Sequence, residues 1–271
     1  MYIRHTCMKC HIERGSSDGI EYEAVMDESG IYQFTCENNH DVTVTVDHER
    51  FEILFHIATR AILDGYHREA VASFAAALER FYEYYVRVIC TKRGIKDNVL
   101  ESAWKPVSNQ SERQLGAYAF SYLLENYAVA PVLSEVDVKF RNRVIHKGLI
   151  PSRCKVIGFG DTVHQIIAPV LQRLKETDRE HMRKVQLKHI IERKEEVQKL
   201  GPGRHEHGMG LPLSLSITSD PPEWQVSVAD TVKELTADRK ARNWFQQIAE
   251  REDAIKSGSP LPDRKYPTAG Q

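Results

Sequence analysis

Apolar residues recur at two different spacings along this chain, and the change of spacing divides it into a β-rich and a helical part. Residues 19–26 (GIEYEAVM), 30–36 (GIYQFTC) and 41–47 (DVTVTVD) are short and partly alternating, which predicts three strands. The turn-forming DESG between the first two predicts a hairpin. From His48 to about Gly201 the apolar residues recur at helical spacing instead. We therefore expect a small β unit followed by a mainly α-helical domain.

Glycines, a proline and a capping signal divide the helical part into separate helices. Ser134 and Asp137 are spaced as a helix N-cap pair, and Gly148 would end the helix that they begin. The last helix has a highly charged second half with few large apolar residues, so we expect that half to project or to pack on a partner. The expected helices end at Gly65 and near Gly94, cover about 98–106, 111–129 and 134–148, and run from about Asp161 to Leu200.

The remaining residues have the composition of a connection and a tail. Residues 201–210 (GPGRHEHGMG) are typical of a linker, residues 211–217 (LPLSLSI) are compatible with a strand, and residues 230–256 predict one helix. The last fifteen residues are expected to be disordered. The predicted domains are a zinc ribbon at 1–47, a helical domain at 48–201, and a C-terminal helical extension with linker and tail at 202–271.

The net charge of -1 is divided unevenly along the 271 residues. Residues 1–47 carry 3 Lys/Arg against 9 Asp/Glu, residues 48–201 carry 25 against 19, and residues 202–271 carry 9 against 10. A polyanion would therefore bind the middle of the chain, although such a charge is also common on an ordinary solvated surface. No run of 18 apolar residues and no secretory signal is present, so we expect a cytoplasmic protein without a membrane partner.

Three of the five cysteines lie in the acidic first part, at spacings typical of metal ligands. Cys7 and Cys10 are separated by two residues, and Cys36 and His40 by three. Zinc takes four sulfur or nitrogen donors at tetrahedral corners. So short a segment cannot bury a large core, and a bound metal ion would explain how it folds. We predict a structural Zn²⁺ bound by these four residues; His5 and His11 remain alternatives for the fourth ligand. The linker also contains His205-Glu206-His207, which could bind a metal, but two ligands in a glycine-rich loop are a weak candidate.

The other two cysteines, Cys90 and Cys154, are expected to be buried structural thiols. An acidic ribbon should repel phosphate, so its expected role is support or protein contact rather than nucleic-acid binding.

The stretch FRNRVIHKG at residues 140–148 combines Arg141, Asn142 and His146 near a predicted helix end. With this Arg-x4-His motif, a polar residue after the arginine and several preceding helices, residues 48–176 resemble the HEPN superfamily (higher eukaryotes and prokaryotes nucleotide-binding). That all-helical group includes many metal-independent endoribonucleases. Other Arg–His pairs of permitted spacing occur in the chain, but only this one has the polar second residue and the closing glycine.

The resemblance implies an HEPN-like helical bundle with a catalytic set of Arg141, Asn142 and His146. It also implies a homodimer, since HEPN ribonucleases pair two motifs across a dimer and this chain has one. Glu79 resembles a carboxylate that several HEPN families keep, and packing against Arg141 is its expected role. In one subgroup a modified tyrosine stands two residues after the histidine; here that position is Gly148, which argues against that regulation.

The chemistry expected of these residues is cleavage of RNA by its own 2′-hydroxyl. Histidine can transfer the protons, and arginine can stabilise the phosphate charge. Arg143 and Lys147 would bind neighbouring phosphates. We therefore expect a metal-independent endoribonuclease, a toxin or antiviral-defence effector with a possible regulatory or antitoxin protein. The alternatives are a non-catalytic HEPN scaffold that binds nucleotide or a partner protein, and a zinc-ribbon adaptor whose helices only dimerise.

Overall fold

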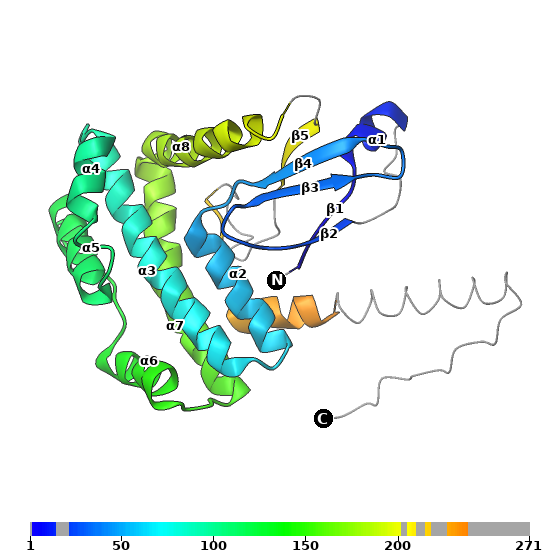
Figure 1. Ribbon diagram of the computed structural model, residues 1–271. Helices are drawn as coiled ribbons and strands as arrows, with labels where there is room; N and C mark the ends of the chain where they lie inside the picture. The colour runs from blue at the N-terminus through cyan, green and yellow to red at the C-terminus, as the bar shows by residue number, and fades with distance from the viewer. Residues whose placement is uncertain (1, 15–21, 202–204, 210–214, 218–226, 238–271) are drawn as a thin grey trace, which may run out of the picture.

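The computed structural model describes residues 2–14, 22–201, 205–209, 215–217 and 227–237. It is mainly α-helical, with a small β region near the N-terminus (Figure 1). Among the described helices, none is long and apolar enough to cross a membrane. The helices are α1 (Met8–Arg14), α2 (Arg50–Leu63), α3 (His67–Lys92), α4 (Asp97–Trp104), α5 (Ser111–Asn126), α6 (Glu135–Lys147), α7 (Arg153–Thr177) and α8 (Arg179–Gln198). The strands are β1 (Tyr2–His5), β2 (Tyr22–Val25), β3 (Ile31–Thr35), β4 (Asp41–Val46) and β5 (His205–Met209).

Helix α3 is the central element of the helical part, and it contacts α2, α5, α6, α7 and α8. Its apolar residues recur at helical spacing, as the sequence predicts, and they face the core on more than one side. Gly65 and Gly94 follow α2 and α3 in the left-handed conformation that ends a helix. Large aromatic side chains fill the space between the helices, among them Phe51, Phe55, Phe74, Phe81, Tyr85 and Tyr118.

The predicted hairpin between the first two strands does not form. Strand β2 pairs antiparallel with β1, from Tyr2↔Val25 to His5↔Tyr22, whereas β3 pairs antiparallel with β4. The residues between β2 and β3 do turn, because the Asp27 carboxylate accepts hydrogen bonds from the backbone and hydroxyl of Ser29. The turn nevertheless joins two different sheets, since β1 supplies the partner for β2.

The predicted linker contains a strand. Residues 205–209 form β5, which pairs parallel with β4 and places three strands in the order β3-β4-β5. Composition reports only local preferences, and Gly and Glu are weak strand formers. The open edge of β4 offers a row of backbone donors and acceptors that a distant segment can satisfy. One strand of the β region therefore comes from residues that follow the helical part in the sequence.

The single long helix expected at 161–200 is two helices. Helix α7 begins at Arg153, earlier than predicted. It ends at Thr177, and Asp178 interrupts the helix before α8 begins. Asp178 is 3% exposed and pairs with Lys92 at 2.9 Å, which ties the break to the end of α3. The charged second half does not project: Met182, Val185 and Val197 are buried, and α8 packs on α3 and α7.

Three further expectations need correction. Cys154 is exposed and Cys90 only half-buried, so neither is a buried structural thiol. Residues 215–217 are not a strand, although Leu215 is fully buried in the helical core. The C-terminal helix covers 228–237 in the described part, two residues earlier than expected, and the rest of 230–256 and the tail lie outside the described residues.

Glu52 links this C-terminal segment to the N-terminus of α2. Its side chain is fully buried and accepts hydrogen bonds from the backbone N–H of Glu49 at 2.6 Å and of Ile217 at 2.7 Å. A buried carboxylate is tolerated here because two N–H groups satisfy it at a positively polarised helix end. Lys175 adds a second tie by donating to the carbonyl of Ser216 at 2.6 Å.

We expect Glu52→Ala to lower the free energy of unfolding by about 2–6 kcal/mol, because two buried N–H groups lose their acceptor at about 1–3 kcal/mol each. Urea titration followed by circular dichroism measures this change. Glu112→Ala, on the exposed first turn of α5, is the matched control and should change stability little. An equally small change for both variants would contradict this role of Glu52.

Candidate functional sites

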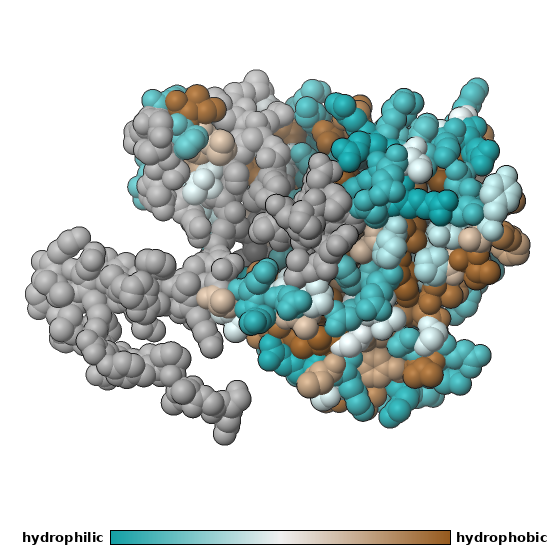
Figure 2. Space-filling view, turned by 180° about the vertical axis from the view of Figure 1, so that it is seen from behind, coloured by the Kyte–Doolittle hydropathy of each residue, from teal (hydrophilic) through white to brown (hydrophobic). Residues whose placement is uncertain are grey.

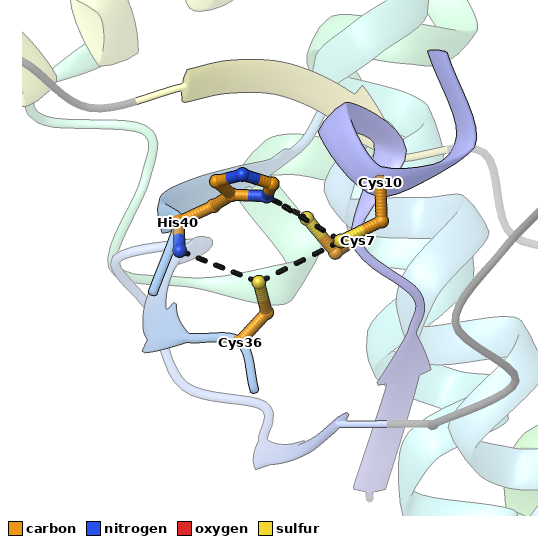
Figure 3. Close-up of side chains that lie close together, drawn as sticks. All are labelled: Cys7, Cys10, Cys36 and His40. Carbon is orange, nitrogen blue, oxygen red and sulfur yellow. Dashed lines mark hydrogen bonds between the residues drawn. The ribbon is translucent and has the colours of Figure 1, made fainter. Parts of the chain in front are cut away.

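Cys7, Cys10, Cys36 and His40 converge from two local elements. Cys7 precedes α1 and Cys10 lies in its first turn, while Cys36 and His40 lie in the connection between β3 and β4 (Figure 3). The ligand atoms of the four residues all lie within 4.8 Å of one another. The first pair thus sits on a helix start rather than on a turn of a hairpin. The two predicted ligand pairs come together at one point.

The distances fit a tetrahedral metal ion. Cys10 Sγ lies 3.7 Å from Cys36 Sγ and 3.4 Å from His40 Nδ1, and Cys7 Sγ lies 3.7 Å from His40 Nδ1. The bond lengths of a zinc site give tetrahedral edges of about 3.8 Å between sulfurs and about 3.5 Å between sulfur and nitrogen. These three distances match the edges of such a site, so the four side chains are placed to hold one metal ion.

Neighbouring groups orient the four ligands. Asn38 Nδ2 donates to Cys10 Sγ at 3.1 Å, and the backbone N–H of His40 donates to Cys36 Sγ at 3.4 Å. Glu13 Oε2 lies 3.2 Å from His40 Nε2, on the far side of the imidazole from the sulfurs. A carboxylate on the outer nitrogen of a histidine holds the other nitrogen ready to bind a metal.

The thiols of the metal-free protein differ in acidity. Burial raises the pKa of Cys10 to about 11. Burial acts in the same direction on Cys36, but the backbone N–H groups of His40 and Asn38 outweigh it and lower the pKa of that thiol. A metal ion binds thiolates, so the ion must displace the proton of Cys10.

The structure also bears on the fourth ligand. His11, an alternative in the sequence, is exposed and does not belong to the cluster, whereas His40 does. His5 lies in β1, and its side chain is outside the described residues, as are those of His205 and His207 in β5.

Helix α6 carries the second candidate site, at the end of the helical part away from the strands (Figure 1). The Ser134 hydroxyl accepts the backbone N–H of Asp137 at 3.2 Å, which is the predicted N-cap. Gly148 closes the helix in the left-handed conformation, with φ of 71°. These two ends place Arg141, Asn142 and His146 in the second half of α6.

Arg141 is held in place by two partners. Its Nη2 donates to Glu79 Oε1 on α3 at 2.8 Å, and its Nη1 donates to Asn142 Oδ1 at 2.9 Å. Glu79 therefore occupies the position next to Arg141 that the sequence suggested. Burial, and then the charge of Glu79, raise the pKa of the neighbouring Tyr82, so this phenol stays protonated at neutral pH.

His146 lies in the last turn of α6 and is exposed, as are Arg143 and Lys147. In the described part of the chain the His146 side chain makes no hydrogen bond. Arg68, at the start of α3, reaches the same helix end and donates to the Ile145 carbonyl at 3.4 Å. One chain thus presents a fixed arginine and a solvent-facing histidine, surrounded by cations.

A feature that the sequence did not reveal lies on another side of α3. A cavity of about 470 Å³, open to solvent on one side, is lined by residues of α3, α4, α8 and the start of α2. The only hint in the sequence is the row Arg80, Glu83, Tyr84 and Arg87, whose spacing places charges on one face of an otherwise apolar helix.

Models of known protein families, curated proteins and solved structures were all compared with the chain, and none matches.

Proposed function

We propose that this protein is a metal-independent endoribonuclease that acts as a homodimer. The arrangement around Arg141 carries the proposal: Glu79 and Asn142 hold its guanidinium in place on the helix that presents His146 to solvent. A helix that served only for packing would need neither a fixed cation nor an exposed imidazole there. Fixed arginines match phosphate oxygens, and imidazole exchanges protons near neutral pH.

The chemistry uses the nucleophile that RNA brings. The 2′-oxygen attacks the adjacent phosphorus and the bond from phosphorus to the 5′-oxygen breaks, which leaves a 2′,3′-cyclic phosphate and a 5′-hydroxyl. One proton leaves the 2′-hydroxyl and one reaches the 5′-oxygen, and His146 transfers one of them. Arg141 stabilises the charge that builds on the phosphate oxygens. Asn142 lies one turn before His146 and so faces the same site.

Two exposed cations complete the substrate surface of α6. Arg143 and Lys147 flank His146 and face solvent. Phosphate contacts of this kind add affinity without choosing a sequence. Glu79 acts as a positioning residue, because its carboxylate touches Arg141 and not the substrate.

A second copy of the chain supplies what one copy lacks. The reaction needs a base and an acid, and one chain provides one histidine at this site. Apolar side chains are exposed along α5, its connection to α6, and α6 itself: Phe120, Leu124, Tyr127, Val129 and Val136 are 69%, 70%, 92%, 90% and 74% exposed. Figure 2 shows apolar surface on this side of the molecule. Val136 lies two turns before Arg143, so this apolar surface adjoins the cationic end of α6.

The double variant Phe120→Glu/Leu124→Glu is expected to be monomeric at micromolar concentration and to lose RNA cleavage, since charge disrupts the apolar contact between copies. Light scattering after size-exclusion chromatography measures the mass. Ile191→Glu is the matched control, because Ile191 lies on α8 and is 53% exposed. This variant should remain dimeric. A wild-type protein that is monomeric and fully active would refute the composite site.

Purified protein is expected to cleave RNA in EDTA and to leave DNA of the same sequence intact, since DNA lacks the 2′-hydroxyl. The measurement is analysis of the product ends, with the metal content of the protein checked after the incubation. Products that end in a 2′,3′-cyclic phosphate support the proposal. Products with a 5′-phosphate, or cleavage lost in EDTA while the ribbon is intact, would indicate a metal nuclease instead.

We infer that the ion bound by Cys7, Cys10, Cys36 and His40 is zinc, and that it is structural. Three thiols and one imidazole are a donor set that zinc favours in closed structural sites. The four ligands leave no open coordination position for a substrate, and none of them lies on α6. The ion would stabilise the β region and take no part in RNA cleavage.

A further inference from the structure

The end of α6 and the start of α7 carry a concentration of positive charge. Residues 138–160 contain six Lys/Arg and no Asp/Glu. Two of the six, Lys139 and Arg141, pair with glutamates at 3.3 Å and 2.8 Å. The other four are exposed, and none of them forms an ion pair with another described residue. They make up a surface that we call the basic patch: Arg143, Lys147, Arg153 and Lys155.

The two helices that carry the basic patch are held against each other. Residues 148–152 connect α6 to α7, and the ring centroids of Phe140 and Phe159 lie 5.6 Å apart between these helices. Val144 and Val156 are fully buried in the same core. The second half of α6 and the start of α7 therefore lie side by side, at the end of the helical part away from the strands (Figure 1). The fold brings the four cations to one region of the surface before any ligand binds.

The cations at the start of α7 do not stabilise the helix that they begin. Arg153 and Lys155 lie in its first turn, where the partial positive charge of a helix N-terminus disfavours cations, and that turn contains no acidic residue. The next carboxylate along α7, that of Asp161, accepts the backbone N–H of Val228 at 2.7 Å and forms no ion pair with either cation. The basic patch is thus an uncompensated positive surface, and a bound anion would relieve its repulsion.

The distribution of charge favours a polyanion over a single small anion. Arg143 and Lys147 lie one turn apart on α6, and the other two cations lie on the next helix, so the basic patch can contact several phosphates of one strand. Residues 1–47 carry 3 Lys/Arg against 9 Asp/Glu, and the strands lie at the other end of the helical part. This separation of charge would orient a polyanion towards the basic patch.

We propose that the basic patch binds the RNA strand beyond the cleaved phosphate, so that the substrate is a long RNA strand rather than a nucleotide or a short oligonucleotide. The inference rests on the proposed function, which supplies the polyanion and places it at α6. Lys147 directly follows His146, so a strand that is cleaved at His146 reaches the basic patch at this residue. Arg153 and Lys155 then bind phosphates farther along the strand. Such contacts add affinity without choosing a sequence.

Binding is measured with RNA that carries 2′-O-methyl groups, because this strand has no free 2′-hydroxyl and stays intact. Fluorescence anisotropy at several salt concentrations compares a strand of about 4 nucleotides with one of about 16. We expect the wild type to bind the long strand more tightly. Arg153→Gln/Lys155→Gln should weaken binding of the long strand about tenfold at low salt. It should also reduce the slope of log affinity against log salt by about 1.4, at about 0.7 for each lost phosphate contact.

Arg183→Gln/Lys194→Gln is the matched control, because it removes the same charge from two exposed residues of α8. It should bind both strands as the wild type does, and circular dichroism checks the fold of each variant. Equal affinity of the folded Arg153→Gln/Lys155→Gln variant and the wild type for the long strand would overturn the proposal. So would an equal loss in the control, which would indicate an effect of net charge alone.

The same proteins separate this proposal from the proposed function. A wild type that binds the long strand through the basic patch but leaves unmodified RNA intact would refute the ribonuclease and retain the binding surface. A wild type that cleaves RNA, with affinity that does not depend on Arg153 and Lys155, would refute the basic patch and retain the ribonuclease.

Discussion

Replacement of His146 by alanine is expected to slow RNA cleavage by about 10²–10⁴-fold, the usual contribution of general acid–base catalysis. The side chain is exposed and makes no hydrogen bond in the described structure, so its removal should leave the fold unchanged. The measurement is the single-turnover rate on a defined RNA, with dimer mass checked for each protein. Overexpression of the wild type, but not of His146→Ala, should also be toxic to cells if RNA is the target.

Variants of Arg141 test whether catalysis needs the geometry of its guanidinium or only its positive charge. Arg141→Lys should remain severely impaired, because the ammonium cannot contact Glu79, Asn142 and a phosphate oxygen with the geometry of a guanidinium. Lys147→Ala should mainly weaken binding, by an amount that grows smaller as salt is raised. A His146→Ala protein that cleaves RNA at the wild-type rate would exclude the α6 site as the catalytic centre.

Replacement of Cys36 by serine, or removal of the metal by a strong chelator, is expected to unfold the β region and leave the helical part folded. The core of the β region is small and consists of Cys7, Cys10, Tyr32, Cys36, Val42, Val44 and Val46, so three of its buried residues belong to the candidate metal site. Structural zinc sites contribute an apparent 10–16 kcal/mol in small zinc-binding peptides, about as much as the whole stability of a domain.

Elemental analysis and hydrogen exchange measure this second prediction together. About one zinc per chain is expected in the wild type, and amide protection in β3 and β4 should be lost with the ion. Cys154→Ser is the matched control, because Cys154 is exposed on α7 and outside the cluster. A metal-free protein whose β3 and β4 amides remain protected would show that the four residues are not a structural metal site.

The ends of several elements, and the members of the metal cluster, could be predicted from the sequence because short-range forces determine them. Ser134 and Gly148 limit α6 through one hydrogen bond and one backbone conformation, each decided within a few residues. The spacing of Cys7 with Cys10, and of Cys36 with His40, allows each pair to present its ligands from one turn. Such signals need no knowledge of distant segments.

The candidate site on α6 could be predicted from the sequence only in part. The order of Arg141, Asn142 and His146 along one helix is visible in the sequence, and so is the identity of Glu79 as a charged residue on an apolar helix. Glu79 and Arg141 are 62 positions apart in the sequence, so their contact at 2.8 Å depends on how α3 and α6 pack. The exposure of His146 likewise follows from which face of α6 the core covers.

The tertiary structure alone decided the features that depend on distant partners. Strand β5 forms because the edge of β4 offers backbone hydrogen bonds, although its own sequence is typical of a linker. The break between α7 and α8 is fixed where Asp178 meets Lys92 at the end of α3. The cavity beside α3 has walls from four elements, and the raised pKa of Glu49 arises from burial among them. Burial and pairing across long stretches of chain are properties of the packed molecule, because no local window of the sequence contains both partners.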